Sequence, residues 1–218
     1  MTGVQTCALP IYGIKWIADE VMAGFGRTGK WFAYHHSSAE PDLIVFAKGV
    51  NSGYVPLGGV IISDEIAKTF DDRVFPGGLT YSGHPLACAA AVATLDAMAE
   101  EKIVENAADM GERVIKPLIH ELMAKHKVIG EVRGRGVFWA LDLVKDRTTR
   151  EPLAPYGGTS PAMAELVGAC KKLGLMPFTN YNRMHICPPC NVSEAELREG
   201  FAILDQAFSA ISSHYTGN

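Results

Sequence analysis

The chain has 218 residues, of which 48% are hydrophobic and 20% are charged, a balance typical of one large soluble globular domain or of a domain and a half. Its formal net charge of −4 comes without a basic block, which argues against a nucleic-acid partner, and no apolar stretch approaches the ~20 residues that span a bilayer. Five cysteines, an odd number, argue against a disulfide framework and suit a reducing, cytoplasmic compartment.

The segment 1–11 differs from the rest of the chain. It is neither charged nor periodic, and it lacks the basic start and the long apolar core of a signal peptide. The codons ACT GGA GTT CAG ACG TGT GCT CTT CCG ATC encode residues 2–11 in order, and they resemble a synthetic sequencing-library adapter. We therefore interpret the segment as non-native and leave it out of the fold prediction; a natural N-terminal segment is the alternative. On this interpretation residues 12–218 are the C-terminal part of a longer protein.

From residue 12 onward, short apolar strands alternate with helical stretches, a pattern that predicts an α/β fold. Glycine, proline or polar clusters bound each apolar run. A proline at position 85 suits the first turn of an alanine-rich helix. In this part of the chain we expect strands at 14–18, 43–47 and 58–62, followed by a helix at 85–99.

The character of the sequence changes near residue 100, where a sheet-rich part gives way to a smaller α+β part. The last helix should open at Ser193, where the sequence SEAE forms a capping box. Before it we expect a polar amphipathic helix at 103–125 that Pro117 is placed to kink, two strands within 128–144 around an RGRG turn, a helix after Ser160 and Pro161, and two short strands flanking Asn180. The sequence therefore predicts two domains, 12–100 and 101–218.

Two charged residues end neighbouring predicted strands of the first domain. Asp19 follows the first strand, and Lys48 closes the apolar run LIVFA 29 residues later (48 − 19). Open parallel sheets bind ligands outside the carboxyl ends of their strands, so both side chains are candidates for one site. The alternative is that Lys48 has only a structural role, as a lysine at the end of a strand whose long side chain places its charged group in water.

The residues around Asp19 suit a flat, positively charged ring. In an extended backbone Asp19 and Val21 point to one side and Glu20 to the other, where we expect an ion pair. A pyridinium ring would place its nitrogen on Asp19 and its face on Val21, while Lys48 would hold an aldehyde. Aspartate and lysine are the two protein groups that pyridoxal phosphate requires, and we expect the apolar strand to desolvate Lys48 and favour its neutral amine.

The motifs around this pair, and their spacing, resemble those of a known family. The motifs are IADEV at 17–21, GFGRTG at 24–29, DLI at 42–44, AKG at 47–49 and GGLTYSGHP at 77–85. Together they resemble the signature of the class III aminotransferases, and the resemblance covers everything after residue 11. It implies a pyridoxal-phosphate-dependent enzyme of fold type I, with a partial large domain at 12–100 and an α+β small C-terminal domain at 101–218.

The same resemblance implies roles for individual residues. Lys48 would bind the cofactor as a Schiff base, and Asp19 would pair with the ring nitrogen, with Val21 against the ring. Thr80 would give its hydroxyl to the cofactor phosphate of the other subunit. The family implies a homodimer with shared active sites.

One departure from the family concerns the substrate. Many members that take α-amino acids or 2-oxoglutarate place an arginine three residues before a Pro-Pro pair, where it holds the substrate carboxylate. This chain has His185 at that position. Arg183 would share a strand face with His185 and is placed to take over the role. We therefore expect both residues at the substrate site, with an amino acid or ω-amino compound as donor and an oxo acid such as pyruvate as acceptor.

The predicted function is ping-pong amino transfer through a pyridoxamine form of the cofactor. An aminomutase or decarboxylase of the same family is the alternative, since both use the same lysine and aspartate. The family builds much of its phosphate site from the half that precedes the Asp-Glu pair, so an inactive truncated fragment is a further alternative. A thiol or zinc module at Cys187 and Cys190 has the least support, and we expect no metal site, because zinc needs a second pair of ligands.

Overall fold

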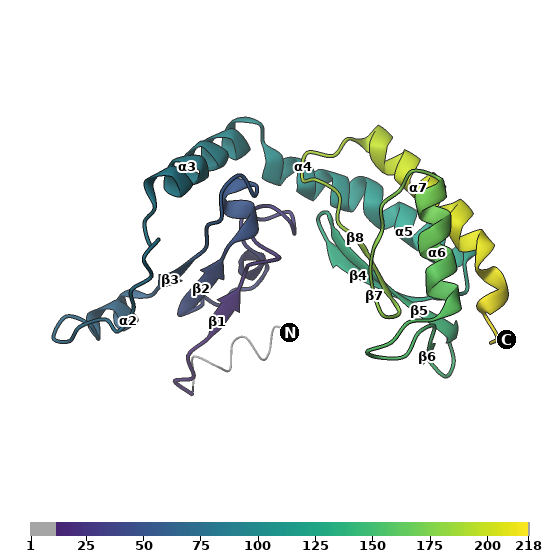
Figure 1. Ribbon diagram of the computed structural model, residues 1–218, viewed down its shortest axis with the longest axis horizontal. Helices are drawn as coiled ribbons and strands as arrows, with labels where there is room; N and C mark the ends of the chain where they lie inside the picture. The colour runs from purple at the N-terminus through teal and green to yellow at the C-terminus, as the bar shows by residue number, and fades with distance from the viewer. Residues whose placement is uncertain (1–11, 218) are drawn as a thin grey trace. The chain divides into compact units, whose positions relative to one another are not determined.

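The computed structural model describes residues 12–217, and the segment 1–11, interpreted above as non-native, lies outside the described residues (Figure 1). The chain divides into two compact units between Glu105 and Asn106. No helix among residues 12–217 combines the length and the apolar character needed to cross a membrane.

The first unit is built on a three-stranded sheet in the order β1-β2-β3. β1 runs parallel to β2, and β2 pairs antiparallel with β3. The strands are short because polar or glycine-rich turns close each apolar run. The elements of this unit are β1 (Ile17–Asp19), the 3-10 turn η1 (Ala33–His36), β2 (Leu43–Phe46), the 3-10 turn η2 (Lys48–Asn51), β3 (Gly59–Ile62), α2 (Asp64–Lys68) and α3 (Pro85–Glu100).

A small core forms where α3 packs on η2. Pro85 is the first residue of α3, as expected, because its missing N–H costs no hydrogen bond there. Phe25 contacts the rings of Phe32 and Phe46 edge to face, with centroids 5.3 and 6.0 Å apart. The buried residues of this core are Phe25, Val50, Ala91, Met98 and Val104.

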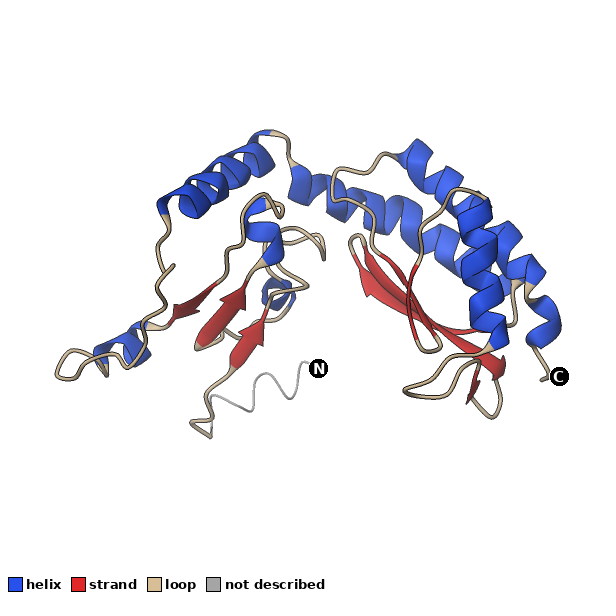
Figure 2. Cartoon of the chain, viewed as in Figure 1, coloured by secondary structure: helices blue, strands red, loops and turns tan. Residues whose placement is uncertain are grey.

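The second unit contains an antiparallel sheet in the order β4-β5-β8-β7, with β6 paired to β5. The helices α5, α6 and α7 lie along one face of that sheet (Figure 2). The remaining elements of the chain are α4 (Ile103–Asp109), a π-helical turn (Met110–Ile115), α5 (Lys116–Lys125), β4 (Ile129–Arg135), β5 (Phe138–Asp146), β6 (Glu151–Pro152), α6 (Pro161–Lys172), β7 (Phe178–Asn180), β8 (Arg183–Ile186), α7 (Glu194–Ala210) and the 3-10 turn η4 (Ser212–His214).

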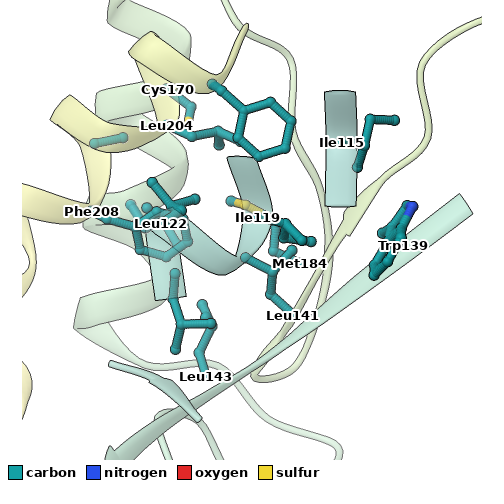
Figure 3. Close-up of a cluster of buried hydrophobic side chains, with 14 of the residues drawn as sticks. Ile115, Ile119, Leu122, Trp139, Leu141, Leu143, Cys170, Met184, Leu204 and Phe208 are labelled. Carbon is teal, nitrogen blue, oxygen red and sulfur yellow. The ribbon is translucent and has the colours of Figure 1, made fainter. Parts of the chain in front are cut away.

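Apolar side chains from the sheet and the three helices pack into one core (Figure 3). Along β5, buried Trp139, Leu141 and Leu143 alternate with half-buried residues, so one face of the strand meets the helices. Ile119 of α5 and Phe208 of α7 are fully buried in the same core. Burying one such side chain stabilises a fold by roughly 1.5–3 kcal/mol, so this core contributes to the stability of the second unit.

The structure corrects three details of the predicted elements. The first strand ends at Asp19 and begins only at Ile17, because only these residues pair with β2. Asn180 is the last residue of β7, so the turn to β8 falls at Tyr181, which has a φ of +55°. The predicted helix at 103–125 is interrupted by the π-helical turn, and Pro117 lies in the first turn of α5. A proline ring clashes with the carbonyl four residues earlier, which disfavours a continuous regular helix through this point.

Candidate active site

Asp19 ends β1 beside Val45 of the parallel strand β2. Its neighbours Ala18 and Glu20 are buried whereas Asp19 is exposed, which confirms the predicted alternation along this strand. One carboxylate oxygen, Oδ1, accepts the backbone N–H of Val21 at 3.1 Å. Oδ2 has no hydrogen-bond donor among residues 12–217, so the carboxylate is accessible to a ligand.

Glu20 is 3% exposed and fixes the turn that follows β1. Its carboxylate accepts the backbone N–H groups of Ala33 at 2.9 Å and Tyr34 at 2.8 Å. Its own N–H donates to the Val45 carbonyl at 2.8 Å. The expected ion pair of Glu20 is therefore wrong for the described part of the chain, because charge-assisted bonds from two amides compensate the buried carboxylate.

Val21 lies in the turn after β1 and is half-buried. The strand alternation that predicts a shared face for Asp19 and Val21 ends at Glu20. Beyond the strand, the hydrogen bond from the Val21 N–H to Asp19 keeps the two residues close together. Contact of Val21 with a cofactor ring stays a prediction.

Lys48 begins η2, just beyond the end of β2 at Phe46. Its φ of +46° turns the chain out of the strand, and its side chain is exposed. The predicted desolvation of Lys48 by the apolar strand is therefore wrong for these residues, because the strand ends before it reaches the lysine. The amine Nζ donates to Met22 Sδ at 2.8 Å, which places it beside the turn that follows Asp19. Lys48 also lines an open pocket between η2 and β3.

Close packing of the loop at 24–29 against η2 fixes the position of Lys48. A Cβ at Gly49 would come within 2.8 Å of the Phe25 Cβ, closer than side chains approach one another. Phe25 itself is 7% exposed and has a φ of +56°. Glycine is therefore required directly after Lys48, because the backbone there lies against the Phe25 side chain.

Thr80 lies in the exposed loop between α2 and α3. Its neighbours Leu79 and Tyr81 are 80% and 78% exposed, and the Ser82 N–H donates to the Leu79 carbonyl at 3.0 Å to close a turn. α3 begins at Pro85, so a helix N-terminus follows the threonine closely. Contact of Thr80 with a phosphate stays a prediction.

Arg183 and His185 lie on β8, in the second unit. The His185 ring lies 5.1 Å from the ring of Phe178 and 6.4 Å from that of Phe138, measured between centroids. Burial lowers the pKa of His185, the neighbouring Arg183 lowers it further, and Asp142 opposes these effects. The imidazole is therefore biased toward its neutral form, and a substrate role for either residue stays a prediction.

Sequence reasoning missed Asp142, which pairs with Arg183 across the β5–β8 ladder. Its Oδ1 lies 3.6 Å from Arg183 Nε, and its Oδ2 pairs with Arg133 of β4. Opposite charges on directly facing strand positions are the signal for such a contact, but that signal needs the strand register. Any substrate carboxylate that binds Arg183 must compete with Asp142.

Cys187 and Cys190 follow β8 and precede α7, which begins at Glu194. Neither cysteine begins a helix, the position that favours a reactive thiolate. Residues 12–217 contain no group of three or more His, Cys, Asp or Glu side chains that is able to hold a metal ion.

The sequence matches the family model described as aminotransferase class-III over residues 7–208. A taurine–pyruvate aminotransferase of Bilophila wadsworthia is 36% identical over 217 residues, which cover 94% of this chain and 46% of that protein. A 5-aminovalerate aminotransferase of Pseudomonas aeruginosa is 40% identical over 206 residues, which cover 92% of this chain and 46% of that protein. The chain thus spans about half the length of the curated relatives it matches.

The fold agrees with solved transaminase structures. The taurine:2-oxoglutarate aminotransferase from Bifidobacterium kashiwanohense, in complex with PLP and glutamate, matches with a TM-score of 0.91 and 41% identity over 97% of this chain and 47% of that one. An S-selective transaminase from Arthrobacter sp. matches with a TM-score of 0.90 and 35% identity over 97% of this chain and 48% of that one. These matches confirm the predicted α/β fold of the fold type I, PLP-dependent enzymes. The family model, the relatives and the fold agree that this chain belongs to the class III aminotransferase family.

Proposed function

We propose that this protein is a pyridoxal-phosphate-dependent aminotransferase that moves an amino group from an amino acid or ω-amino compound to an oxo acid such as pyruvate. The observation that supports this most directly is the placement of Asp19 and Lys48 at the carboxyl ends of two neighbouring parallel strands. Relatives named taurine–pyruvate and putrescine–pyruvate aminotransferase support amino transfer over the aminomutase or decarboxylase alternative.

The residues present fit pyridoxal phosphate. When bound, this cofactor supplies an aldehyde that takes up the amino group and a ring that accepts electrons. Asp19 offers an accessible carboxylate oxygen that would keep a proton on the ring nitrogen, with Val21 beside the ring. Lys48 offers an exposed amine that would hold the aldehyde and then move a proton at the substrate carbon.

Arg183 is our candidate for binding the carboxylate of the oxo acid, with neutral His185 beside it. At 3.6 Å, the contact between Arg183 Nε and Asp142 Oδ1 is loose compared with the roughly 2.8 Å of a strong charge-assisted bond. A substrate carboxylate with closer geometry would displace Asp142, which keeps Arg133 as a partner. Asp142 would thus set how strongly Arg183 binds oxo acids.

We further propose a cytoplasmic homodimer in which Thr80 reaches the cofactor phosphate of the partner subunit. Residues 12–100 would form part of the cofactor-binding large domain and residues 101–218 the small domain. The loop that carries Thr80 exposes several apolar side chains, which supports contact with a second chain. These are Val74 (90% exposed), Phe75 (61%), Leu79 (80%) and Tyr81 (78%). The cysteine usage supports the compartment.

The test is an assay of alanine formation from pyruvate, run on a chain extended to the length of its relatives. Taurine, 5-aminovalerate, putrescine and 4-aminobutyrate serve as donors, after the names of those relatives. We expect alanine formation that requires added pyridoxal phosphate and is lost in Lys48→Ala. Release of CO₂, or an isomerised amino acid without alanine, would instead establish the decarboxylase or aminomutase alternative.

A further inference from the structure

Met22 contacts the candidate nucleophile directly, since Lys48 Nζ lies 2.8 Å from Met22 Sδ. Both side chains are exposed, Met22 by 52%, so burial of apolar surface does not explain the contact. A thioether sulfur is also a weak hydrogen-bond acceptor, and water offers an amine better partners. The contact therefore depends on how the backbone places the two side chains.

Buried groups fix the backbone on both sides of this contact. The turn that carries Met22 begins at Glu20, whose buried carboxylate holds two backbone amides, and the Gly24 N–H donates to the Glu20 carbonyl at 2.9 Å. On the other side, Gly49 lies against Phe25, which holds η2 and its first residue in place. The fold therefore brings together the backbone segments that carry Met22 and Lys48, and the contact between sulfur and amine then fixes where the lysine side chain ends.

We propose that Met22 is a positioning residue for Lys48: its sulfur holds the amine at the carboxyl end of β1, near Asp19, where the cofactor aldehyde would arrive. This inference rests on the proposed function. The neutrality of the sulfur matters because a carboxylate in the same place would favour the ammonium form, which cannot attack an aldehyde. Among residues 12–217, Lys48 forms no ion pair with a carboxylate.

The test follows the reaction of Lys48 with pyridoxal 5′-phosphate in the chain extended to the length of its relatives. The neutral amine adds to the aldehyde carbon, and a C=N bond forms as the aldehyde oxygen leaves in water with both amine protons. Added borohydride then delivers hydride to the carbon, and water supplies a proton to the nitrogen. Peptide mass spectrometry measures the adduct on Lys48 against time and pH, so the readout is independent of turnover.

Three variants separate positioning from general effects on the chain. Met22→Leu keeps the apolar bulk but removes the sulfur, and we expect the rate of adduct formation on Lys48 to fall about threefold to tenfold, because the lysine side chain is no longer ordered. Met22→Glu should raise the pH of half-maximal rate by about one unit, because a nearby carboxylate favours the ammonium. Met176→Leu removes a methionine that is 80% exposed in the second unit, and it should change neither quantity.

Unchanged rates and pH profiles in both Met22 variants would overturn the positioning role while leaving the proposed function intact. A wild-type chain in which other lysines react and Lys48 does not would contradict the proposed function, and the role of Met22 with it. The contact itself has a separate readout in the ε-methyl NMR resonance of Met22. We expect that resonance to shift in Lys48→Ala and not in Lys68→Ala; no shift in the former would contradict the contact.

Discussion

The two units of the chain differ in how completely they bury their apolar residues. In the second unit the sheet and its helices enclose one core in which Ile119, Leu141 and Phe208 are fully buried. In the first unit β3 is open on both faces, since Val60 is 52% exposed and Ile61, which points the other way, is 48% exposed. The unit with the candidate catalytic residues is therefore the less completely packed of the two.

Because of this difference, we expect the stability of the fold and the chemistry of the cofactor to depend on different units. The second unit has the buried apolar surface that stabilises a domain, while the first unit offers the carboxyl ends of β1 and β2, where ligands of parallel sheets bind. The exposed strand and loop residues of the first unit are of the kind that mark contacts with further chain or with a partner. Substitutions should therefore affect folding in one unit and cofactor chemistry in the other.

The largest effect should come from the core of the second unit. Phe208→Ala should lower the free energy of unfolding by about 3–5 kcal/mol, because a fully buried ring is replaced by a cavity. Ile61→Ala in the first unit should cost less than about 1 kcal/mol, because that side chain is already half in water. Urea unfolding of both variants measures the difference, and equal losses of unfolding free energy would contradict the difference in packing between the units.

Arg183→Ala tests whether the second unit contributes to substrate binding. In the extended chain, the loss of one charge-assisted pair should raise the KM for the oxo acid by the equivalent of about 1.5–3 kcal/mol, roughly tenfold to 150-fold. The adduct on Lys48 should form at the unchanged rate, because Arg183 is proposed to bind the substrate and not the cofactor. A KM that stays the same for every oxo acid tried would remove Arg183 from the substrate site.

Gly49→Ala tests whether packing in the first unit places Lys48. The added methyl would overlap the Phe25 side chain, and such overpacking typically costs about 1–3 kcal/mol. We expect slower adduct formation on Lys48 and an unchanged unfolding transition of the second unit. Gly78→Ala is the matched control, because a Cβ there would meet no atom within 4 Å. Normal adduct formation in Gly49→Ala would show that η2 needs no such support.

The smallest effect concerns the titration of His185. Because Arg183 lowers the pKa of His185, Arg183→Ala should raise it toward its ordinary value. Asp142→Asn should have the opposite effect, because the carboxylate favours the imidazolium. NMR titration of the imidazole protons, assigned with His185→Gln, measures both shifts. Shifts of the same sign in the two variants would contradict the arrangement of charges on β5 and β8.

Local sequence signals predicted the parts of the structure that depend on neighbouring residues. The capping box at the start of α7 is present: Ser193 Oγ accepts the Glu196 N–H at 3.3 Å, and the Glu196 carboxylate accepts the Ser193 N–H at 2.8 Å. The alternation that exposes Asp19 and buries Glu20 was likewise readable from the strand pattern. Both features lie within a few residues and need no knowledge of the tertiary fold.

Features that depend on contacts between distant segments could not be predicted from local sequence signals. The exposure of Lys48 follows from where β2 ends and from the packing of Gly49 on Phe25. The pairing of Asp142 with Arg183 follows from the strand register. Neither the end of a short strand nor the register of an antiparallel pair is fixed by the local hydrophobic pattern, because tertiary packing selects among the options.

We propose that Lys48 is the residue that binds the cofactor aldehyde and that Asp19 pairs with the ring nitrogen. The most direct measurement is borohydride reduction of the extended chain in the presence of pyridoxal 5′-phosphate, followed by peptide mapping of the modified lysine. We expect one dominant adduct on Lys48, its loss in Lys48→Ala and its retention in Asp19→Asn. A dominant adduct on Lys15, Lys30 or Lys68 in the wild-type chain would contradict it.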